Sequence, residues 1–316
     1  GQGVKRFFKW LGVALAALIL APLAVLLALG LRGDLSLDEL KPRYTDQNSR
    51  FVEIDGLNVH YRDQGPRTAP VLVLLHGSAA SLHTWEGWER ALRNDFRLIS
   101  VDLPAHGLTG PWLKDGDYTL DGYARFVDRF LGKLDVQRFS LAGNSMGGAI
   151  GWTYAARYPQ KVEKLILIDA AGYPRSESQR FFGLMGFPLV DVTFRWFTPH
   201  LVVQRIVRGL YADPTKVDDG LVDRYRDLVR RAGNRAAIVP RMRAFNPDPA
   251  LLKTLKLPVL IMWGGKDKLL LPSEAFRFQN DIADATLKVY SDAGHMPMEE
   301  IPEATARDAR KFLLGR

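Results

Sequence analysis

The chain contains no cysteine, and this absence excludes two kinds of structure and chemistry. No disulfide can brace the fold, and no thiolate can act as a nucleophile or a metal ligand. The His, Asp and Glu residues form no cluster with metal-ligand spacing, and no glycine-rich phosphate loop or dinucleotide fingerprint is present. The sequence therefore predicts a protein that uses no metal and no other cofactor.

The basic residues are not gathered into a lysine-rich arm, and they do not alternate with aromatic residues. Nucleic acid is therefore not an expected partner. The 316 residues nevertheless carry a net charge of +8, which needs an explanation. A membrane surface explains this charge better, because of the residues at the start of the chain.

Residues 11–31 form a stretch of 21 residues without a charge, and three basic residues precede it. A helix of this length would span roughly 30 Å, the thickness of a bilayer core. The sequence therefore predicts an uncleaved, single-pass transmembrane anchor within residues 1–32. The preceding positive charge predicts a cytoplasmic N-terminus, with the rest of the chain on the opposite side, in the periplasm of a diderm bacterium. The alternatives are a cleavable signal peptide and a buried helix.

Small residues recur at four-residue spacing within this stretch, as in the pairs Gly12/Ala16 and Ala24/Ala28. Such spacing lets two helices approach closely in a membrane. A homodimer formed through the anchor helix is therefore a further prediction.

Short apolar, β-rich runs alternate with helical patterns in the rest of the chain. This alternation predicts an α/β fold with a mostly parallel sheet that helices cover on both faces. Two short strands joined at Asp55-Gly56 precede it. The predicted strands are residues 71–75, 97–102, 138–143, 164–169, 258–263 and 287–291, and the predicted helices lie near 82–93, 119–134, 146–158 and 272–283, with a last one from about 303.

The strand–helix alternation stops at residue 172 and resumes after residue 250, which predicts a helical cap inserted into the core. This cap has thirteen basic and eight acidic residues, and it holds several aromatic side chains. We expect it to face the membrane; an ordinary solvated surface is the alternative. The predicted organisation is an anchor (1–32), a juxtamembrane linker (33–49), the first part of the core (50–171), the cap (172–250) and the second part of the core (251–316).

A Gly-x-Ser-x-Gly motif centred on Ser145 lies between a predicted strand and a predicted helix. In such a sharp turn the serine is strained, and its neighbours must be small to avoid collision. Gly143 and Gly147 provide this room, and Gly148 lets the helix approach the sheet. We therefore expect Ser145 to be a nucleophile.

A serine nucleophile needs a base, and the base needs an acid that orients it. His295 follows the last predicted strand and is the expected base; His200 lies within the cap, and His76 precedes the serine. Asp267 follows the strand at 258–263 and is the expected acid. Asp169 also ends a strand and is the rival for this role, whereas the remaining candidates, Asp284 and Asp292, have weaker claims.

The oxyanion of an acyl-transfer intermediate needs two N–H donors. We expect the backbone N–H groups of Ser78, in the loop after the strand at 71–75, and of Met146, at the start of the following helix. His76 is expected to shape this loop through hydrogen bonds.

Five segments together resemble the α/β-hydrolase family: "HGSAAS" (76–81), "DLPAHG" (102–107), "GNSMGG" (143–148), "WGGKDKLLLP" (263–272) and "AGHMPMEE" (293–300). The resemblance covers residues 51–316. It implies the α/β-hydrolase fold, a triad of Ser145, Asp267 and His295, and an oxyanion hole at Ser78 and Met146. With its apolar N-terminus, the chain looks similar to bacterial membrane-anchored esterases and phospholipase A-like hydrolases.

The expected function is hydrolysis of acyl esters, of phospholipid or lysophospholipid type, by a membrane-anchored serine hydrolase. The lipid expectation rests on the anchor and on the cap aromatics Phe181, Phe182, Phe187, Phe194, Trp196 and Phe197. One alternative is a hydrolase of C–C bonds or of other small molecules, and another is a membrane scaffold without catalytic activity.

Overall fold

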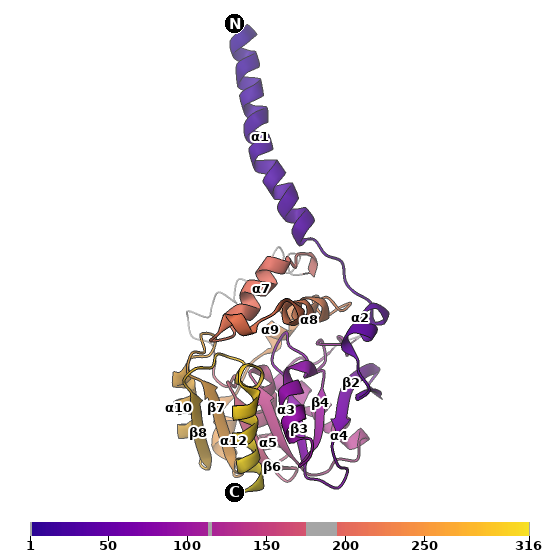
Figure 1. Cartoon of the computed structure of the whole chain (residues 1–316), viewed down its shortest axis with the longest axis vertical. Coiled ribbons are helices and arrows are strands. Elements are labelled where there is room, and N and C mark those ends of the chain that lie inside the picture. Colours follow the sequence, from indigo (N-terminus) through magenta and orange to yellow (C-terminus); the bar gives the residue numbers. More distant parts are fainter. Residues whose placement is uncertain (1, 113–115, 175–194, 316) are drawn as a thin grey trace.

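The computed structural model describes residues 2–112, 116–174 and 195–315 (Figure 1). Eight strands form one sheet in the order β1-β2-β4-β3-β5-β6-β7-β8. β2 pairs antiparallel with both β1 and β4, and all the other neighbours are parallel. The strands are β1 (Ser49–Ile54), β2 (Leu57–Gln64), β3 (Val71–Leu75), β4 (Arg97–Val101), β5 (Phe139–Asn144), β6 (Val162–Ile168), β7 (Val259–Gly264) and β8 (Ala285–Tyr290).

Successive residues of the central strands belong to two different hydrophobic cores, because side chains alternate between the faces of a sheet. In β3, Val73 and Leu75 belong to the core under α4 (Leu120–Lys133), α5 (Met146–Arg157) and α10 (Pro272–Asp281). Leu72 and Leu74 belong to the core under α3 (Glu86–Leu92) and α12 (Pro302–Leu314). The predicted α/β class, with helices on both faces of a mostly parallel sheet, is therefore confirmed, and strand limits differ from the predicted ones by at most two residues.

The described part of the chain between β6 and β7 contains α7 (His200–Gly209), η3 (Pro214–Lys216), α8 (Asp219–Val229), α9 (Ile238–Ala244) and η4 (Pro249–Thr254). The helices labelled α7, α8 and α9 lie between the sheet and the base of the N-terminal helix in Figure 1. Of the predicted cap aromatics, Trp196 and Phe197 are described. Phe181, Phe182, Phe187 and Phe194 lie outside the described residues.

The N-terminal helix α1 (Gln2–Gly30) projects away from the body of the protein (Figure 1). Its end is tied to the chain that precedes α7. The Thr198 N–H donates to the Gly30 carbonyl at 2.8 Å, and the Arg32 N–H donates to the Trp196 carbonyl at 2.9 Å. The predicted linker is not without structure, since it contains α2 (Leu37–Tyr44).

The prediction of a transmembrane anchor at residues 11–31 is not supported. Within residues 2–112, 116–174 and 195–315, no helix combines the length and the apolar character needed to cross a membrane.

Asp102, directly after β4, fixes three segments that surround the predicted active site. Its buried carboxylate accepts hydrogen bonds from His60 Nδ1–H at 2.7 Å, from the Leu82 N–H at 2.8 Å and from the Leu108 N–H at 2.9 Å. Buried backbone N–H groups need hydrogen-bond acceptors, and the carboxylate of Asp102 is the acceptor for two such groups. The loops after β3 and β4 therefore share one polar anchor.

We predict that Asp102→Asn lowers the free energy of unfolding by about 2–4 kcal/mol, because an amide cannot accept with both of its atoms and buried donors lose their partner. Urea unfolding of both proteins measures this loss. Asp121→Asn is the control, since Asp121 forms an exposed ion pair with Arg157 and should cost less than about 1 kcal/mol. Equal losses in the two variants would contradict the assigned role of Asp102.

Candidate active site

Ser145 lies in the turn between β5 and α5, with φ 52° and ψ −116°. A residue with a Cβ atom rarely adopts such a positive φ, and it does so only when its surroundings enforce it. The Ser145 N–H donates to the Ile168 carbonyl at 3.0 Å, and the Ser145 carbonyl accepts from the Ala171 N–H at 3.0 Å. Both bonds reach the end of β6, so the neighbouring strand holds the strained turn in place.

The glycines around Ser145 fill positions where no side chain fits. A Cβ atom on Gly143 would lie 2.2 Å from the Gly147 carbonyl oxygen, and one on Gly147 would lie 2.2 Å from the Leu75 carbonyl oxygen. A Cβ atom on Gly148 would lie 2.5 Å from that of Ala170. The expectation that all three glycines make room for the turn and the helix is therefore confirmed.

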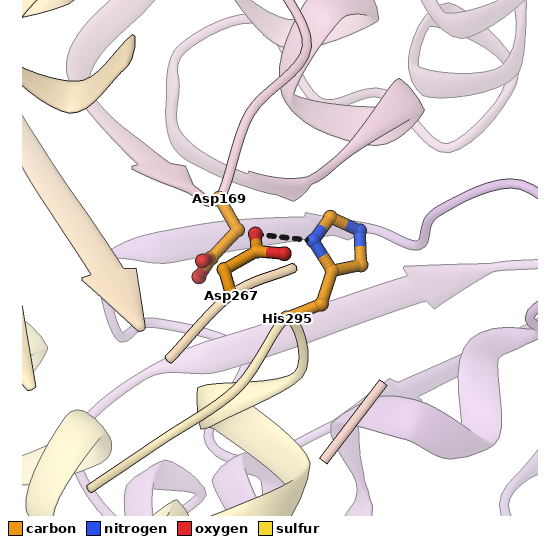
Figure 2. Close-up of side chains that lie close together, drawn as sticks. All are labelled: Asp169, Asp267 and His295. Atoms are coloured by element: carbon orange, nitrogen blue, oxygen red, sulfur yellow. Dashed lines mark hydrogen bonds and ion pairs between the residues drawn. The ribbon is translucent and has the colours of Figure 1, made fainter. Parts of the chain in front are cut away.

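Asp267 and His295 form a buried hydrogen-bonded pair (Figure 2). His295 Nδ1–H donates to Asp267 Oδ2 at 2.7 Å. The other oxygen, Oδ1, accepts from the Leu269 N–H at 2.7 Å and from the Leu270 N–H at 3.0 Å. The turn after β7 thus fixes the carboxylate, and the carboxylate fixes the imidazole, as an acid that orients a base must do.

Asn144 connects the histidine loop to the serine turn. Its Nδ2 donates to the carbonyl of His295 at 3.1 Å and to the carbonyl of Ile168 at 3.1 Å. Asn144 is the residue immediately before Ser145, so this side chain brings the loop of the base next to the turn. Sequence reasoning missed this role, although a polar residue at the end of a buried strand was a usable signal.

Glu300 attaches the same histidine loop to the cap, and sequence reasoning missed it too. Its buried carboxylate accepts from the Gly294 N–H at 2.8 Å and from the Ala212 and Asp213 N–H groups at 3.1 and 2.8 Å. The His295 N–H donates to the carbonyl of Leu210 at 2.7 Å. The position of His295 therefore depends on residues of the cap as well as of the core.

The side chains of the alternative histidines have other partners. His200 is on α7, half-exposed, beside Asp223 and Arg226. His76 Nδ1 donates to the Gly77 carbonyl at 2.7 Å and its Nε2 accepts from the Leu103 N–H at 3.0 Å, so both ring nitrogens serve the loops. The expected structural role of His76 is confirmed.

The rival acids have other surroundings. Asp292 is exposed beside Lys266, and Asp284 lies before β8. Asp169, however, is buried next to Asp267 and His295 (Figure 2). Its Oδ1 accepts from the Gly264 N–H at 2.9 Å, and its Oδ2 is buried without a hydrogen-bond partner. Asp169 is therefore a neighbour of the acid–base pair and more than a turn residue.

Burial, followed by the charge of Asp267, raises the pKa of Asp169 well above its usual range. Two buried carboxyl groups side by side do not both ionise readily. Asp267 accepts three N–H donors, whereas Asp169 accepts one. The carboxyl of Asp169 therefore favours its protonated form more than an exposed aspartate does.

Asp169, Asp267 and His295 each offer a potential metal ligand within 4.8 Å of the others. Hydrogen bonds already explain their spacing, since His295 Nδ1 carries the proton that it donates and both oxygens of Asp267 accept from N–H groups. The group is therefore best described as a hydrogen-bonded set of two carboxyls and an imidazole.

A pocket of about 260 Å³ opens at Ser145. The two expected oxyanion donors, Ser78 and Met146, both line it beside the serine. Most of the exposed lining is apolar. The lining residues are Ser78, Ser145, Met146, Ala171, Gly172, Tyr173, Arg241, Met242, Phe245, Leu269, Leu270 and Glu274. A serine at the mouth of a small apolar pocket, with a fixed imidazole nearby, is suited to acyl transfer.

Comparisons with known proteins agree with this arrangement. The family model for the alpha/beta hydrolase fold matches residues 70–302. Human monoacylglycerol lipase ABHD6 is 30% identical over 285 residues, which cover 84% of this chain and 81% of that protein. The crystal structure of a bacterial membrane phospholipase A superposes with a TM-score of 0.72 at 26% identity, over 99% of this chain and 98% of that one.

A third relative is named as the hydrolase of a dienoic acid. The 2-hydroxy-6-oxo-6-(2'-aminophenyl)hexa-2,4-dienoic acid hydrolase of Metapseudomonas resinovorans is 26% identical over 277 residues, which cover 84% of this chain and 91% of that protein.

We predict that Asp169→Asn gains stability relative to the wild type as the pH rises from 5 to 8. The folded-state pKa of Asp169 lies above its unfolded value, so the wild type loses stability as the pH rises between the two. The loss reaches about 1.4 kcal/mol per pH unit, and the amide does not share it. Urea unfolding at several pH values measures the difference.

Asp63→Asn is the control for this experiment. Burial raises the pKa of Asp63, but Arg97 and Arg67 outweigh this effect and hold it below its usual value. The difference between Asp63→Asn and the wild type should therefore stay constant from pH 5 to 8. A constant difference for Asp169→Asn as well would show that Asp169 is ionised.

Proposed function

The chain belongs to the α/β-hydrolase family, and we propose that it is a serine carboxylic-ester hydrolase whose substrates are acyl esters of lipids. One observation supports this proposal: Asn144, the residue before the strained Ser145, donates to the carbonyl of His295, whose imidazole is held by the buried Asp267. The proposed nucleophile, orienting acid and base then follow one another in the chain in the order expected for this architecture.

In the proposed mechanism, His295 Nε2 removes the proton of Ser145 Oγ as the oxygen attacks the ester carbonyl. The negative charge that forms on the carbonyl oxygen is stabilised by the N–H groups of Ser78 and Met146. His295, held by Asp267, then protonates the leaving alcohol. Water, activated by the same imidazole, hydrolyses the acyl-enzyme and restores the free serine. Each preorganised N–H donor of an oxyanion hole lowers the free energy of the acyl-transfer transition state by about 3–4 kcal/mol.

The lipid part of the proposal has two supports. The pocket at Ser145 is mostly apolar, as an acyl chain requires. Two relatives are a monoacylglycerol lipase and a membrane phospholipase A, whose names state lipid esters as substrates or membranes as location.

A second candidate is hydrolysis of C–C bonds, which the dienoic acid hydrolase among the relatives favours. It requires the same serine and histidine, so the two candidates differ in substrate only. A catalytically inactive membrane scaffold would retain the fold without using the site at all.

We also propose that the protein is attached to a membrane. Several exposed apolar side chains lie on α1, among them Leu18, Ile19 and Leu20. α7, next to the base of α1, exposes Leu201 and Ile206 together with two arginines at 205 and 208. An apolar surface flanked by basic groups is suited to an anionic membrane. Pairing of two α1 helices through their small residues stays a prediction.

We predict that the wild type hydrolyses p-nitrophenyl esters of short fatty acids and that Ser145→Ala lowers kcat by at least about 10³-fold, because the acyl-enzyme cannot form. A fluorophosphonate probe should label the wild type and leave Ser145→Ala unlabelled. Ser291→Ala, which removes an exposed hydroxyl that donates to Asp292, is the control and should be labelled fully.

Equal labelling of Ser145→Ala and the wild type would contradict the serine mechanism. If the probe labels Ser145 and the enzyme hydrolyses a dienoic acid rapidly but does not hydrolyse the acyl esters, the result would favour hydrolysis of C–C bonds. Absence of labelling and of both activities would favour a scaffold.

We predict that the full chain sediments with vesicles containing anionic phospholipid, and that Leu18→Asp with Ile19→Asp lowers the bound fraction more than about tenfold, because each buried carboxylate costs about 2.5–3.5 kcal/mol in an apolar lipid environment. Phe276→Asp on α10 is the control, since it removes an exposed apolar side chain far from α1. Similar binding by both variants would contradict attachment through α1.

A further inference from the structure

Arg241, on α9, brings a buried positive charge to the wall of the active-site pocket. Its side chain is held at one nitrogen: Nη1 lies 2.7 Å from His106 Nε2 and donates to Ser78 Oγ at 3.2 Å. His106 donates through Nδ1 to the Pro104 carbonyl at 3.0 Å, so its Nε2 is the acceptor. Both partners of the guanidinium are therefore neutral, and they orient the charge without compensating it.

No carboxylate of the described residues forms an ion pair with Arg241. Its Nε is buried without a partner, and Nη2 makes no hydrogen bond within residues 2–112, 116–174 and 195–315. Burial lowers the pKa of Arg241, and the phenols of Tyr123 and Tyr118 act in the opposite direction. An arginine stays protonated even so.

The other two buried arginines of the described residues are paired. Arg62 contacts Glu89 and Glu86, and Arg235 contacts Asp34. A buried cation without an anion costs several kcal/mol, so native proteins seldom keep one without a use for it. Arg241 departs from this rule at the place where a substrate would bind.

We propose that Arg241 binds an anionic group of the substrate, a carboxylate or a phosphate, so that the preferred ester carries a negative charge close to its scissile carbonyl. This inference rests on the proposed esterase function and names its substrate class. Arg241 lines the pocket, and its guanidinium has N–H groups that no described residue accepts, so it can donate to the oxygens of such a group. The contact of Nη1 with Ser78 holds the guanidinium near the expected oxyanion hole.

The test uses two pairs of esters that differ in one charge. In the first pair, p-nitrophenyl hydrogen glutarate and p-nitrophenyl valerate, a carboxylate replaces the terminal methyl group of the acyl chain. In the second pair, lysophosphatidate and monoacylglycerol with the same acyl chain, a phosphate is added to the alcohol. The first pair tests an anion on the acyl side, and the second tests one on the alcohol side.

For the wild type we expect kcat/KM to be at least about tenfold higher for the anionic member of one pair, equivalent to about 1.4 kcal/mol. Arg241→Met should abolish this preference, and Arg241→Lys should retain part of it, because the lysine keeps the charge but loses the fork. Arg138→Met, which removes an exposed charge outside the cap, should leave the ratio unchanged.

Two results would overturn the inference. One is a wild type that hydrolyses the neutral members as well as the anionic ones in both pairs. The other is an Arg241→Met variant that lowers kcat/KM equally for both members, since Arg241 would then only hold Ser78 in place. In either case hydrolysis of the neutral esters would leave the proposed function standing.

A second experiment measures the binding of anions to a variant that cannot turn over the substrate. Ser145→Ala titrated with inorganic phosphate or glutarate in a calorimeter should bind at least one of the two, and Ser145→Ala with Arg241→Met should bind neither. If the double variant does not fold, competition decides: phosphate or glutarate should inhibit hydrolysis of p-nitrophenyl valerate by the wild type competitively. No binding and no inhibition by either anion would contradict the role of Arg241.

Discussion

Ser145 must adopt a left-handed backbone conformation in a space where three chain segments nearly touch, and the centre of the fold is arranged around this constraint. The strain is of order 1–3 kcal/mol, and the surrounding structure must outweigh it. Hydrogen bonds from the end of β6 hold the serine backbone, and glycines replace every side chain that would collide. The close packing of β3, β5 and α5 follows from the same condition, because any side chain at 143 or 147 would separate them.

A second condition is that buried carboxylates organise the loops at the carboxyl edge of the sheet. Asp102 gathers the segments after β3 and β4, Asp267 fixes the turn after β7, and Glu300 connects the histidine loop to the cap. Each of them accepts backbone N–H groups that would otherwise be buried without partners. Two buried ionisable groups near the site, Asp169 and Arg241, depart from this pattern. Burial and the charge of Asp267 raise the pKa of Asp169 well above its usual range, and Arg241 carries a charge that no carboxylate of the described residues pairs with.

The sequence could predict those features that depend on local pattern. Apolar runs located the strands within two residues, and the motif around Ser145 predicted a turn whose crowding the structure confirms. The sequence could not predict contacts between segments that are far apart in the chain. The bond from Asn144 to the His295 loop joins residues 151 positions apart, and nothing in the sequence shows that Arg241 lacks an anion. The uncharged stretch at residues 11–31 also led to the prediction of a transmembrane helix. None of the described helices meets the requirement for a membrane span.

The central claim is that Ser145 carries the acyl group of the substrate during turnover. The most direct measurement is mass spectrometry of peptides from enzyme quenched with acid while it hydrolyses p-nitrophenyl valerate. The account predicts a valeryl group on the peptide that contains Ser145, formed within the first turnover and absent from Ser145→Ala. Steady hydrolysis of the ester with no acyl group on Ser145, or with the acyl group on another residue, would contradict it.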